Sequence, residues 1–395
     1  MKGRIKLRLG AGLIVLALIA IGVSACGSSS DTSSSSESGT TNGESSSTSS
    51  SEGSEGGGGS VVAAPSTEEP SEIPITKPLN GPVPDKTVAW LACELPICQE
   101  GLSRGWHHAA EALGWNLNQI NYKTLEPQKG VQQALNEKVE AMGITGIPPA
   151  AFEAQAKQAI AEDVPIVSGS EITEPEPKVN GLYYQGQNQE SVEEASKLIA
   201  DWAIHDSGGE MNMATVTIEE YPILIAEVEG LEKTVEADCS ECEPVGKIPV
   251  TVEDVGEGRV PAKIAAYLQT HPDVNYLQFT FSDLATGVYD TLKPLGLTDK
   301  VKLIGQNGNP TNMHEIVEGK SAMWTLQPQE YFMYLQADVL ARVFTDTPLE
   351  PYEKAGTLPY WVAEKPQAEE VLEKYEGNWP GPKGFEKHFE QLWGS

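Results

Sequence analysis

One stretch of the chain has the spacing of a catalytic serine. Gly101-Leu102-Ser103-Arg104-Gly105 matches Gly-x-Ser-x-Gly, the nucleophile elbow, in which a sharp turn between a strand and a helix exposes the serine hydroxyl. Here eight residues separate the motif from the end of the apolar run at Ala92, and Trp106-His107-His108-Ala109-Ala110 continues it as a helix interior. A surface α/β hydrolase that uses Ser103 as its nucleophile is therefore a less favoured alternative.

Cys26 closes an N-terminal segment with the pattern of a secretory signal. The segment begins with the basic residues Lys2, Arg4, Lys6 and Arg8, and an apolar run follows over 9–23. It ends with Val23-Ser24-Ala25-Cys26. The run is too short to remain as a spanning helix. The tetrapeptide resembles a bacterial lipobox, which implies a signal peptide over 1–25, lipidation of the Cys26 sulfur and attachment to the outer face of a membrane.

Beyond Cys26 the composition changes to Ser, Gly, Glu, Thr and then Pro, up to about residue 84. A segment with so little apolar surface cannot offset the entropy of ordering. We therefore predict a disordered tether over 26–84, with a root-mean-square reach on the order of 40 Å.

Four further cysteines form two close pairs along the chain, Cys93 with Cys98 and Cys239 with Cys242. Outside the cytoplasm disulfides persist, and the short spacings favour a local bridge within each pair. Two other interpretations remain open. Cys-x-x-Cys is half of a Cys₄ zinc site, and Cys239-Ser240-Glu241-Cys242 has the spacing of a redox pair.

The chain is strongly acidic, with 57 Asp and Glu against 27 Lys and Arg and a formal net charge of −30. Cleavage before Cys26 removes four basic residues and no acidic one, which changes the charge to −34. Nucleic acid is excluded as a partner, because phosphate neutralisation needs clustered Lys and Arg. The arginines that remain after cleavage are Arg104, Arg259 and Arg342. Guanidinium groups are the usual clamp for phosphate, so this scarcity argues against a phosphate ligand. No His-Glu-x-x-His motif, phosphate-binding glycine loop or dinucleotide motif occurs. Apart from the zinc alternative at the cysteines, neither a metal nor a cofactor is expected.

From residue 85 onward, short apolar runs alternate with longer amphipathic stretches. A first series predicts strands at 87–92, 117–122, 139–147, 164–167 and 182–184, with helices at 99–113, 127–142 and 151–162. A second series predicts strands at 211–217, 247–252, 274–281, 301–304 and 322–326, with helices at 191–205, 223–237, 261–268, 284–292, 312–318 and 330–344. This alternation predicts an α/β fold of two doubly wound, parallel-sheet lobes.

Ligands of open parallel sheets bind beyond the carboxyl ends of the strands. The loops there supply the candidate ligand-binding residues Glu94, Gln99, Ser168, Ser170, Gln187, Glu219, Tyr221, Ser282, Asp283, Asn307, Asn309 and Gln327. Further aromatic candidates are Tyr183, Tyr184 and Trp324. Amides, hydroxyls and carboxylates can hold adjacent hydroxyl groups, while aromatic faces cover the apolar side of a ring. A small, polar, hydroxyl-bearing ligand is therefore predicted.

Several short segments occur in a telling order: Ala109-Ala110-Glu111-Ala112-Leu113-Gly114, Val164-Pro165-Ile166-Val167, His271-Pro272-Asp273-Val274, Leu303-Ile304-Gly305-Gln306-Asn307-Gly308 and Leu326-Gln327-Pro328. With them, residues 86–345 resemble the type I periplasmic solute-binding proteins of ABC importers, in the ribose-type sugar-binding branch. The resemblance implies two lobes that close on a ligand and three hinge crossings. We expect these near 185–189, near 252–258 or residue 282, and near 327–329.

The resemblance also implies polar ligand contacts at Asn307, at Gln327 and at Ser282 with Asp283. Two departures concern the ligand. Where ribose-type proteins have Asp-Arg after Val-Pro-Ile-Val, this chain has Ser170-Glu171, and where they have an arginine in the first helix of the second lobe, it has apolar Ile225 or its neighbours. The ligand can thus differ from an arginine-clamped pentose or pyranose.

The predicted domains after the tether are a first lobe (85–187 plus 329–346), a second lobe (188–328) and a C-terminal extension (347–395) without an assigned role. The predicted function is a lipid-anchored, non-enzymatic solute-binding protein that captures a small sugar or sugar-like ligand and delivers it to an ABC permease. The alternative is a sensor module that binds the ligand and reports its presence.

Overall fold

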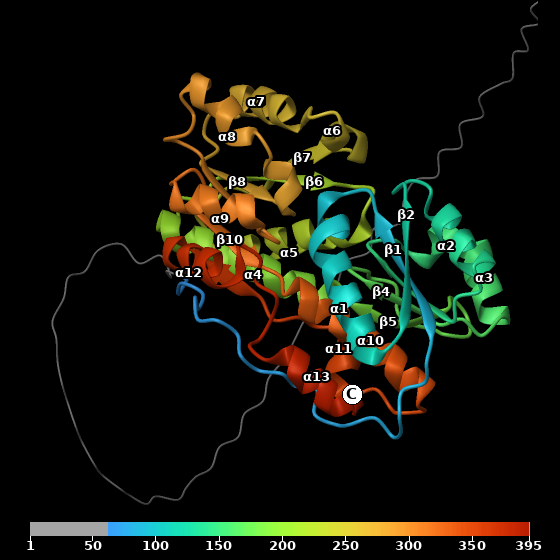
Figure 1. Cartoon of the computed structure of the whole chain (residues 1–395). Helices are drawn as coiled ribbons and strands as arrows, with labels where there is room; N and C mark the ends of the chain where they lie inside the picture. The colour runs from blue at the N-terminus through green and yellow to red at the C-terminus, as the bar shows by residue number, and fades with distance from the viewer. Residues whose placement is uncertain (1–61, 395) are drawn as a thin grey trace, which may run out of the picture. The chain divides into compact units, whose positions relative to one another are not determined.

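The computed structural model describes residues 62–394 (Figure 1). The predicted signal peptide, Cys26 and most of the predicted tether lie outside the described residues. Between residues 62 and 394, no helix is both long and apolar enough to cross a membrane.

A five-stranded parallel sheet forms the centre of the first lobe, in the order β2-β1-β3-β4-β5. Its strands are β1 (Thr87–Cys93), β2 (Asn116–Tyr122), β3 (Ala141–Thr145), β4 (Ile166–Gly169) and β5 (Leu182–Gly186). Its helices and helical turns are η1 (Cys98–Leu102), α1 (Ser103–Leu113), α2 (Pro127–Asn136), η2 (Pro149–Phe152), α3 (Glu153–Ala161) and α10 (Gln329–Phe344). Helices α1 and α10 pack together, as do α2 and α3 on the other side of the sheet (Figure 1). Every residue of β3 and β4 is buried, as expected of a sheet covered on both faces.

The second lobe contains a six-stranded sheet in the order β11-β10-β9-β8-β6-β7. Its strands are β6 (Met213–Ile218), β7 (Gly246–Val250), β8 (Tyr276–Phe279), β9 (Lys302–Gly305), β10 (Met323–Leu326) and β11 (Trp361–Ala363). Its helices and turns are α4 (Gln189–Ser207), α5 (Pro222–Asp238), α6 (Val252–Gly256), α7 (Val260–Thr270), η3 (Ser282–Ala285), α8 (Val288–Leu292), η4 (Lys293–Leu295), α9 (Pro310–Val317) and α12 (Lys365–Tyr375). All neighbours pair in parallel except β10 and β11. The predicted α/β class with two parallel-sheet lobes is confirmed.

Local backbone geometry explains where the elements differ from prediction. The predicted helix 127–142 ends at Asn136, because Lys138 takes a left-handed φ of 61° that turns the chain into β3. The predicted helix 284–292 is divided into η3 and α8, and Gly287 between them has φ 75°. Helix α4 begins where Asn188 accepts a hydrogen bond from the Ser191 amide at 3.1 Å, a typical N-cap.

The chain crosses between the lobes three times. The first two crossings, 187–188 after β5 and 327–328 after β10, lie where they were expected. The third was predicted near 252–258 or residue 282, and that prediction is wrong, because both segments lie within the second lobe as α6 and η3. The third crossing is instead residues 345–360, which lead from α10 to the antiparallel edge strand β11. A three-residue strand has too short a pattern to be found from sequence.

The C-terminal extension belongs to both lobes. Strand β11 and helix α12 join the second lobe, where α12 packs on α9. Helix α11 (Pro351–Ala355) contacts β5, and helix α13 (Phe385–Trp393) packs on α10 and α1 of the first lobe. Trp361, Trp379 and Trp393 are buried in this packing, which gives the extension a structural role.

Residues 62–84, here called the N-terminal strap, lie along this extension. The Thr67 carbonyl accepts a hydrogen bond from the Trp361 indole at 2.9 Å, and the Glu69 carboxylate accepts one from Trp379 at 3.0 Å. The Ile75 side chain is fully buried. The prediction of disorder is therefore wrong for this part of the tether. The strap has no helix or strand of its own, so its composition could not reveal the partners that hold it.

A buried ion cluster around Arg342 joins the strap to the extension. The Arg342 guanidinium is fully buried, with Nε 2.7 Å from Asp338 Oδ2 and 3.1 Å from Glu353 Oε1. Its Nη2 donates to the Lys77 carbonyl at 2.9 Å, and Glu350 Oε1 accepts from the Lys77 amide at 2.7 Å. Burial, with Asp338 close by, raises the pKa of Glu353 to about 9. Arg342 therefore has a structural role and does not line the cavity between the lobes.

Candidate ligand-binding cleft

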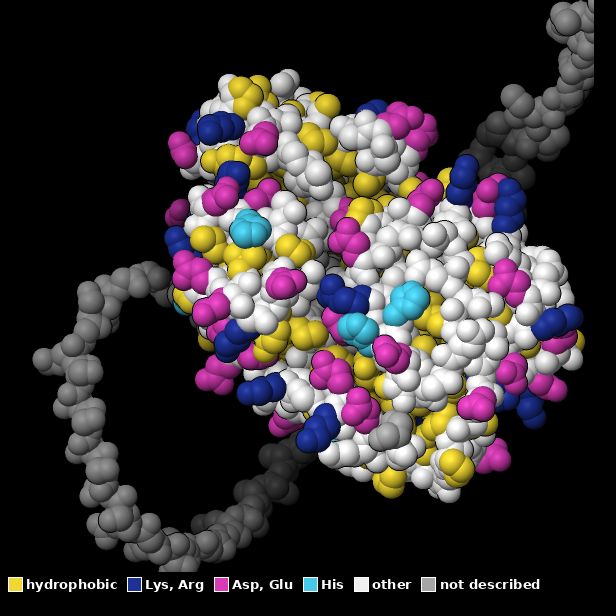
Figure 2. Space-filling view, viewed as in Figure 1, with side chains coloured by type: hydrophobic (Ala, Val, Ile, Leu, Met, Phe, Trp, Pro, Cys, Tyr) yellow, Lys and Arg dark blue, Asp and Glu magenta, His cyan; other side chains and the backbone are white. Residues whose placement is uncertain are grey.

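A cavity lies between the two lobes and receives side chains from both. Its atom-free space is about 630 Å³, part of which is open to solvent. In Figure 2 the surface is hollowed between the lobes, and the basic side chains on this face are scattered among acidic ones. The polar residues that line the cavity are Thr145, Ser170, Gln187, Tyr221, Glu227, Gln306, Asn307 and Gln327. The apolar ones include Leu95, Ile97, Leu102, Val192, Ile223, Leu224 and Phe281.

Three of the lining residues share an unusual backbone. Ser170, Gln187 and Asn307 follow β4, β5 and β9, and their φ angles are 51°, 51° and 57°. Left-handed backbone is disfavoured for residues other than glycine, and it concentrates at functional sites. Here the backbone turns directly after a strand end, and all three residues line the cavity. All three were predicted from their position at strand ends.

A chain of hydrogen bonds connects two of these residues, Ser170 and Gln187, to other residues across the hinge. The Ser170 hydroxyl donates to Gln187 Oε1, and Gln187 Nε2 donates to the Tyr360 hydroxyl at 3.0 Å. The Gln306 amide is satisfied in the orientation in which its Oε1 accepts from Gln187 Nε2 at 3.2 Å. Its Nε2 then donates to the two Glu227 oxygens at 3.1 and 3.2 Å. Tyr360 lies in the third crossing, so this amide chain ties two crossings to both lobes.

Glu227 ends the amide chain and was missed by the sequence analysis. Its side chain is fully buried, and Gln278 Nε2 donates to its Oε1 at 2.9 Å. Removal from water raises the pKa of Glu227 well above its usual value, only partly opposed by the Gln278 hydrogen bond. Glu227 lies within helix α5, whereas the strand-end rule points only to loops. One signal was available, since it falls four residues from both Ile223 and Leu231 on an otherwise apolar helix face.

Two buried polar atoms in the cavity wall have no protein partner. These are Oδ1 of Asn307, a hydrogen-bond acceptor, and Nε2 of Gln327, a donor. Both residues are more than nine-tenths buried. Buried polar groups normally have partners, so this pair indicates a ligand that both donates and accepts, as a hydroxyl group does.

The remaining predicted residues lie outside the cavity wall. Glu94 and Asp283 line a separate groove at the cleft mouth, and Glu219 lines a shallow groove beside β7. Asn309 caps α9, Gln99 donates to the Cys93 carbonyl, and Ser168 and Ser282 are buried behind the surface. Of the aromatic candidates, Tyr221 lines the cavity, whereas Tyr184 and Trp324 are buried in the lobes and Tyr183 packs against the core. Phe281 was not predicted.

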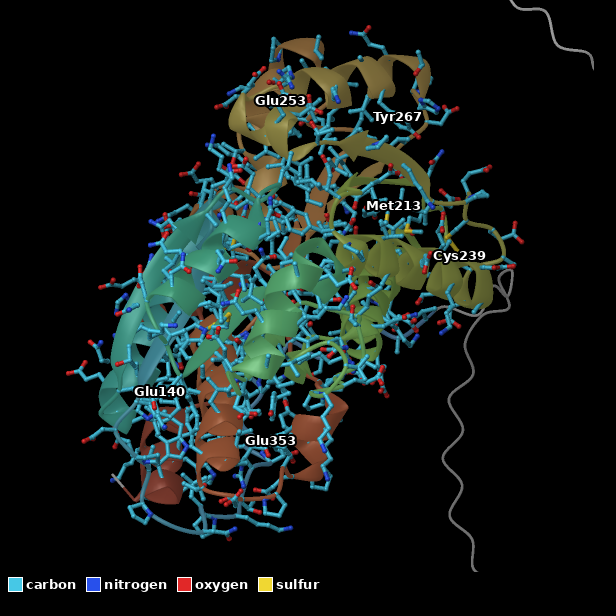
Figure 3. All side chains as sticks on the ribbon, turned by 90° about the vertical axis from the view of Figure 1, so that its right-hand side faces the viewer. Glu140, Met213, Cys239, Glu253, Tyr267 and Glu353 are labelled. Atoms are coloured by element: carbon cyan, nitrogen blue, oxygen red, sulfur yellow. A yellow bond between two sulfur atoms is a disulfide. The ribbon has the colours of Figure 1, made fainter. Side chains whose placement is uncertain are left out.

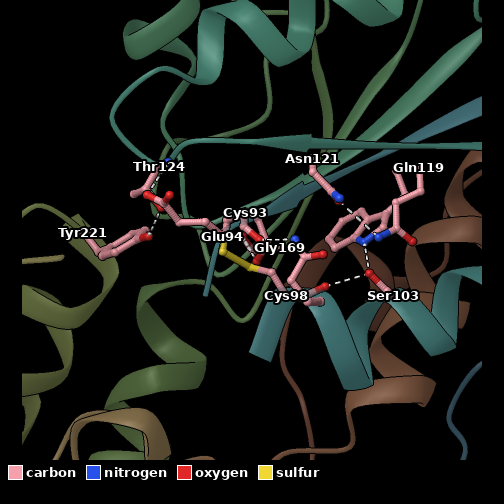
Figure 4. Close-up of a disulfide and its surroundings, with 12 residues drawn as sticks. Cys93, Glu94, Cys98, Ser103, Gln119, Asn121, Thr124, Gly169 and Tyr221 are labelled. Atoms are coloured by element: carbon pink, nitrogen blue, oxygen red, sulfur yellow. Dashed lines mark hydrogen bonds between the residues drawn. A yellow bond between two sulfur atoms is a disulfide. The ribbon is translucent and has the colours of Figure 1, made fainter. Parts of the chain in front are cut away.

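The lobes touch at the cleft mouth, around the loop between Cys93 and Cys98 (Figure 4). The Tyr221 hydroxyl of the second lobe donates to Thr124 Oγ1 of the first at 3.2 Å. Asp283 of the second lobe accepts from the Ile97 amide of the loop, and its Oδ2 has no partner. Burial raises the pKa of Asp283 to about 6 in spite of the Ile97 hydrogen bond, and nearby Glu100 adds to the effect.

The two cysteine pairs are each at bonding distance. The sulfur atoms of Cys93 and Cys98 are 2.13 Å apart, and those of Cys239 and Cys242 are 2.00 Å apart. The first pair lies on the rim of the first lobe, and Figure 3 shows Cys239 on the second lobe. Within residues 62–394, no cluster of three or more His, Cys, Asp or Glu is arranged to hold a metal ion.

The Ser103 hydroxyl, the one candidate nucleophile, is engaged on both sides. It donates to the Cys98 carbonyl at 2.7 Å and accepts from the Trp90 indole at 2.9 Å (Figure 4). Its side chain is buried beneath the π-helical turn η1, behind the cavity wall. This geometry gives Ser103 a role in packing α1 against β1.

Solved structures show the same fold at low sequence identity. A carbohydrate transporter from Acidothermus cellulolyticus 11B in complex with myo-inositol aligns with a TM-score of 0.62 and 20% identity, covering 73% of this chain and 98% of that one. A sugar ABC transporter from Yersinia enterocolitica gives 0.64 and 13%, covering 79% and 95%. An ABC transporter periplasmic solute binding protein from Actinobacillus succinogenes 130z with bound D-allose gives 0.60 and 15%, covering 72% and 99%.

The family comparison goes further than the fold. No curated protein matches the chain. The periplasmic binding protein domain matches residues 99–347, which are more than half of the chain and include every residue of the amide chain except Tyr360. This match confirms the resemblance that the sequence motifs indicated, and the protein belongs to the periplasmic binding protein domain family.

Proposed function

We propose that this protein captures a small, sugar-like solute between its lobes and delivers it to an ABC permease. The observation that carries the proposal is the cavity itself, to which both lobes contribute. In its wall, Asn307 Oδ1 and Gln327 Nε2 are buried without a hydrogen-bond partner from the protein. The related structures support it, since two of them hold myo-inositol and D-allose, which are small polyhydroxylated molecules.

The proposal includes the predicted attachment to the membrane. The lipobox-like segment at Cys26 would place a lipid on the outer face, and the folded part would act near its permease. The two cysteine pairs at bonding distance fit an oxidising compartment, where such bridges persist.

Thermal-shift screening of the full mature chain against sugars, polyols, nucleosides and amino acids tests the proposal. Binding stabilises the folded state, by about 2.7 kcal/mol at 100 times Kd. We expect the sugars or polyols to raise the melting temperature, and titration calorimetry to give one site. Recovery of a chemically altered ligand, or stabilisation by amino acids or nucleosides alone, would contradict the proposal.

Transport is tested separately from binding. Cells that carry the gene should accumulate the labelled ligand, and cells that lack it should not. Normal accumulation in the deleted strain, together with a lost response to the ligand, would instead favour the sensor module.

A further inference from the structure

The cavity wall has no group that could neutralise a charged ligand. Among the described residues that line it, Glu227 is the one acid, and Lys, Arg and His are absent. No ion pair between residues 62 and 394 includes Glu227, and its carboxyl oxygens accept from the side-chain amides of Gln278 and Gln306. A carboxylate or phosphate group brought here would lose its hydration without gaining an opposite charge, which costs several kcal/mol. An ammonium group would find the Glu227 oxygens already occupied by the amides of Gln278 and Gln306.

One side of the cavity is apolar. Leu95, Ile97 and Leu102 contribute from the first lobe together with the Cys93–Cys98 pair, and Ile223 and Phe281 face them from the second. Four of the polar residues, Ser170, Gln187, Asn307 and Gln327, lie at strand ends near the hinge, whereas Glu227 comes from helix α5 and Tyr221 from its N-cap. A ligand that is hydroxylated all round would leave some hydroxyl groups against hydrocarbon.

Glu227 lies at one end of the amide chain. In the orientation that satisfies both atoms of the Gln306 amide, Gln306 Nε2 donates to the Glu227 oxygens and Gln306 Oε1 accepts from Gln187 Nε2. Gln187 Oε1 in turn accepts from the Ser170 hydroxyl. Reversal of a single amide would set donor against donor or acceptor against acceptor. The hydrogen of Ser170 is therefore committed to Gln187, and its oxygen is left to accept from the ligand.

From this arrangement we propose that the cleft takes an uncharged ligand with neighbouring hydroxyl groups at one edge and a deoxy or alkyl group at the other, and that Glu227 is a specificity-determining residue of the site. The inference rests on the proposed function and deepens it. Glu227 acts as a positioning residue, since it determines which atoms Gln187, Gln306 and Ser170 offer to the ligand.

Calorimetry with matched sugars tests the ligand class. The probes are D-galactose, 6-deoxy-D-galactose, D-galacturonate and D-galactosamine, with the corresponding D-glucose series measured in parallel. In the series that binds, we expect the 6-deoxy sugar to bind at least as tightly as its parent, and the uronate and the amino sugar to bind roughly 100-fold more weakly. A charged sugar that binds within threefold of the 6-deoxy sugar would overturn the inference but leave solute capture intact. No binding by any sugar of either series would overturn this inference, whereas solute capture is overturned only if the wider screen of sugars and polyols also finds no ligand.

Variants of helix α5 test the role of Glu227. Glu227→Gln should weaken binding of the uncharged sugars about tenfold and change the ratio of the Kd values of the parent and 6-deoxy sugars by about fivefold. Glu229→Gln, an exposed residue of the same helix, should leave both within twofold. Should Glu227→Gln fail to fold, Gln306→Met breaks the chain while keeping the acid, and the same change in ratio is expected. A uniform loss of affinity, with the ratio unchanged, would mean that Glu227 is merely structural.

Discussion

The protonation of Asp283 should make ligand affinity depend on pH. Asp283 accepts a hydrogen bond from the Ile97 amide of the opposite lobe, in a groove that Glu94 and Lys123 line from the first lobe. Contact between the lobes buries its carboxyl, and this desolvation raises its pKa from 3.8 to about 6. When the lobes separate, water returns to Asp283, and its pKa should fall back toward 3.8.

The sign follows from proton uptake. A raised pKa means that the closed state holds its proton up to about pH 6, whereas the open state loses it near pH 4. Closure is therefore favoured below about pH 6, and this contribution is lost as the pH rises through 6. With these two pKa values, closure is about tenfold more favourable at pH 5.0 than at pH 7.5, which is roughly 1.4 kcal/mol. An uncharged ligand that requires closure should show the same tenfold difference in Kd.

Titration calorimetry of wild type and Asp283→Asn, at pH 5.0 and 7.5 with one uncharged sugar, measures this effect. The variant cannot ionise at residue 283, so the tenfold difference in Kd between the two pH values should be lost. Glu253→Gln removes an exposed carboxylate that lines the same groove, and it should keep the wild-type dependence. Equal pH dependence in wild type and Asp283→Asn would refute the reasoning.

Three further predictions follow from other parts of the chain. Asn307→Ala or Gln327→Ala leaves a ligand hydroxyl unpaired, which costs about 1 to 3 kcal/mol. Calorimetry should therefore show binding weakened by roughly 5- to 150-fold. Kd values within twofold of wild type for both variants would contradict the site. Arg342→Met leaves buried carboxylates without their cation and should lower the free energy of unfolding in urea by about 3 to 5 kcal/mol. The control Arg104→Met breaks a partly exposed ion pair with Glu330 and should change this free energy by less than about 1 kcal/mol. Equal losses in the two variants would contradict the buried cluster. Cys26→Ser should move the protein from the membrane fraction to the soluble fraction on cell fractionation, and unchanged membrane association would exclude the lipid anchor.

The fold was largely readable because parallel strands that are buried on both faces appear as short apolar runs. β1, β3 and β6 were found in this way, and only their ends moved. The antiparallel strand β11 was not, because Trp361–Ala363 is too short to show a pattern and depends on pairing with β10. The prediction of disorder failed in the strap for a related reason, since the strap is ordered by partners 294 and 310 residues away, Trp361 and Trp379.

The site was predictable where position alone decides the contact. Ser170, Gln187 and Asn307 follow strand ends, and topology brings those ends together. Asn309 follows the same rule but caps its helix, because a side chain at an N-cap is committed to its own backbone. Glu227 and Tyr360 were missed because each reaches the hinge from an element that strand-end reasoning ignores. Their identification needs the helix rotation and the crossing that only three-dimensional coordinates give.

The path of the strap determines where a pulling force would enter the folded part. The Val62 carbonyl is 3.0 Å from the His205 ring at the end of α4 in the second lobe, and the strap reaches β1 of the first lobe only after residue 84. Tension from an upstream membrane anchor would therefore load the second lobe first, and the contacts at Val62, Thr67, Glu69 and Ile75 would yield in turn. Peeling these residues away would also break the Lys77 contacts with Arg342 and Glu350. It would lengthen the free leash by about 75 Å, at roughly 3.3 Å for each extended residue. The strap is thus a reserve of reach that shortens again when the load is removed.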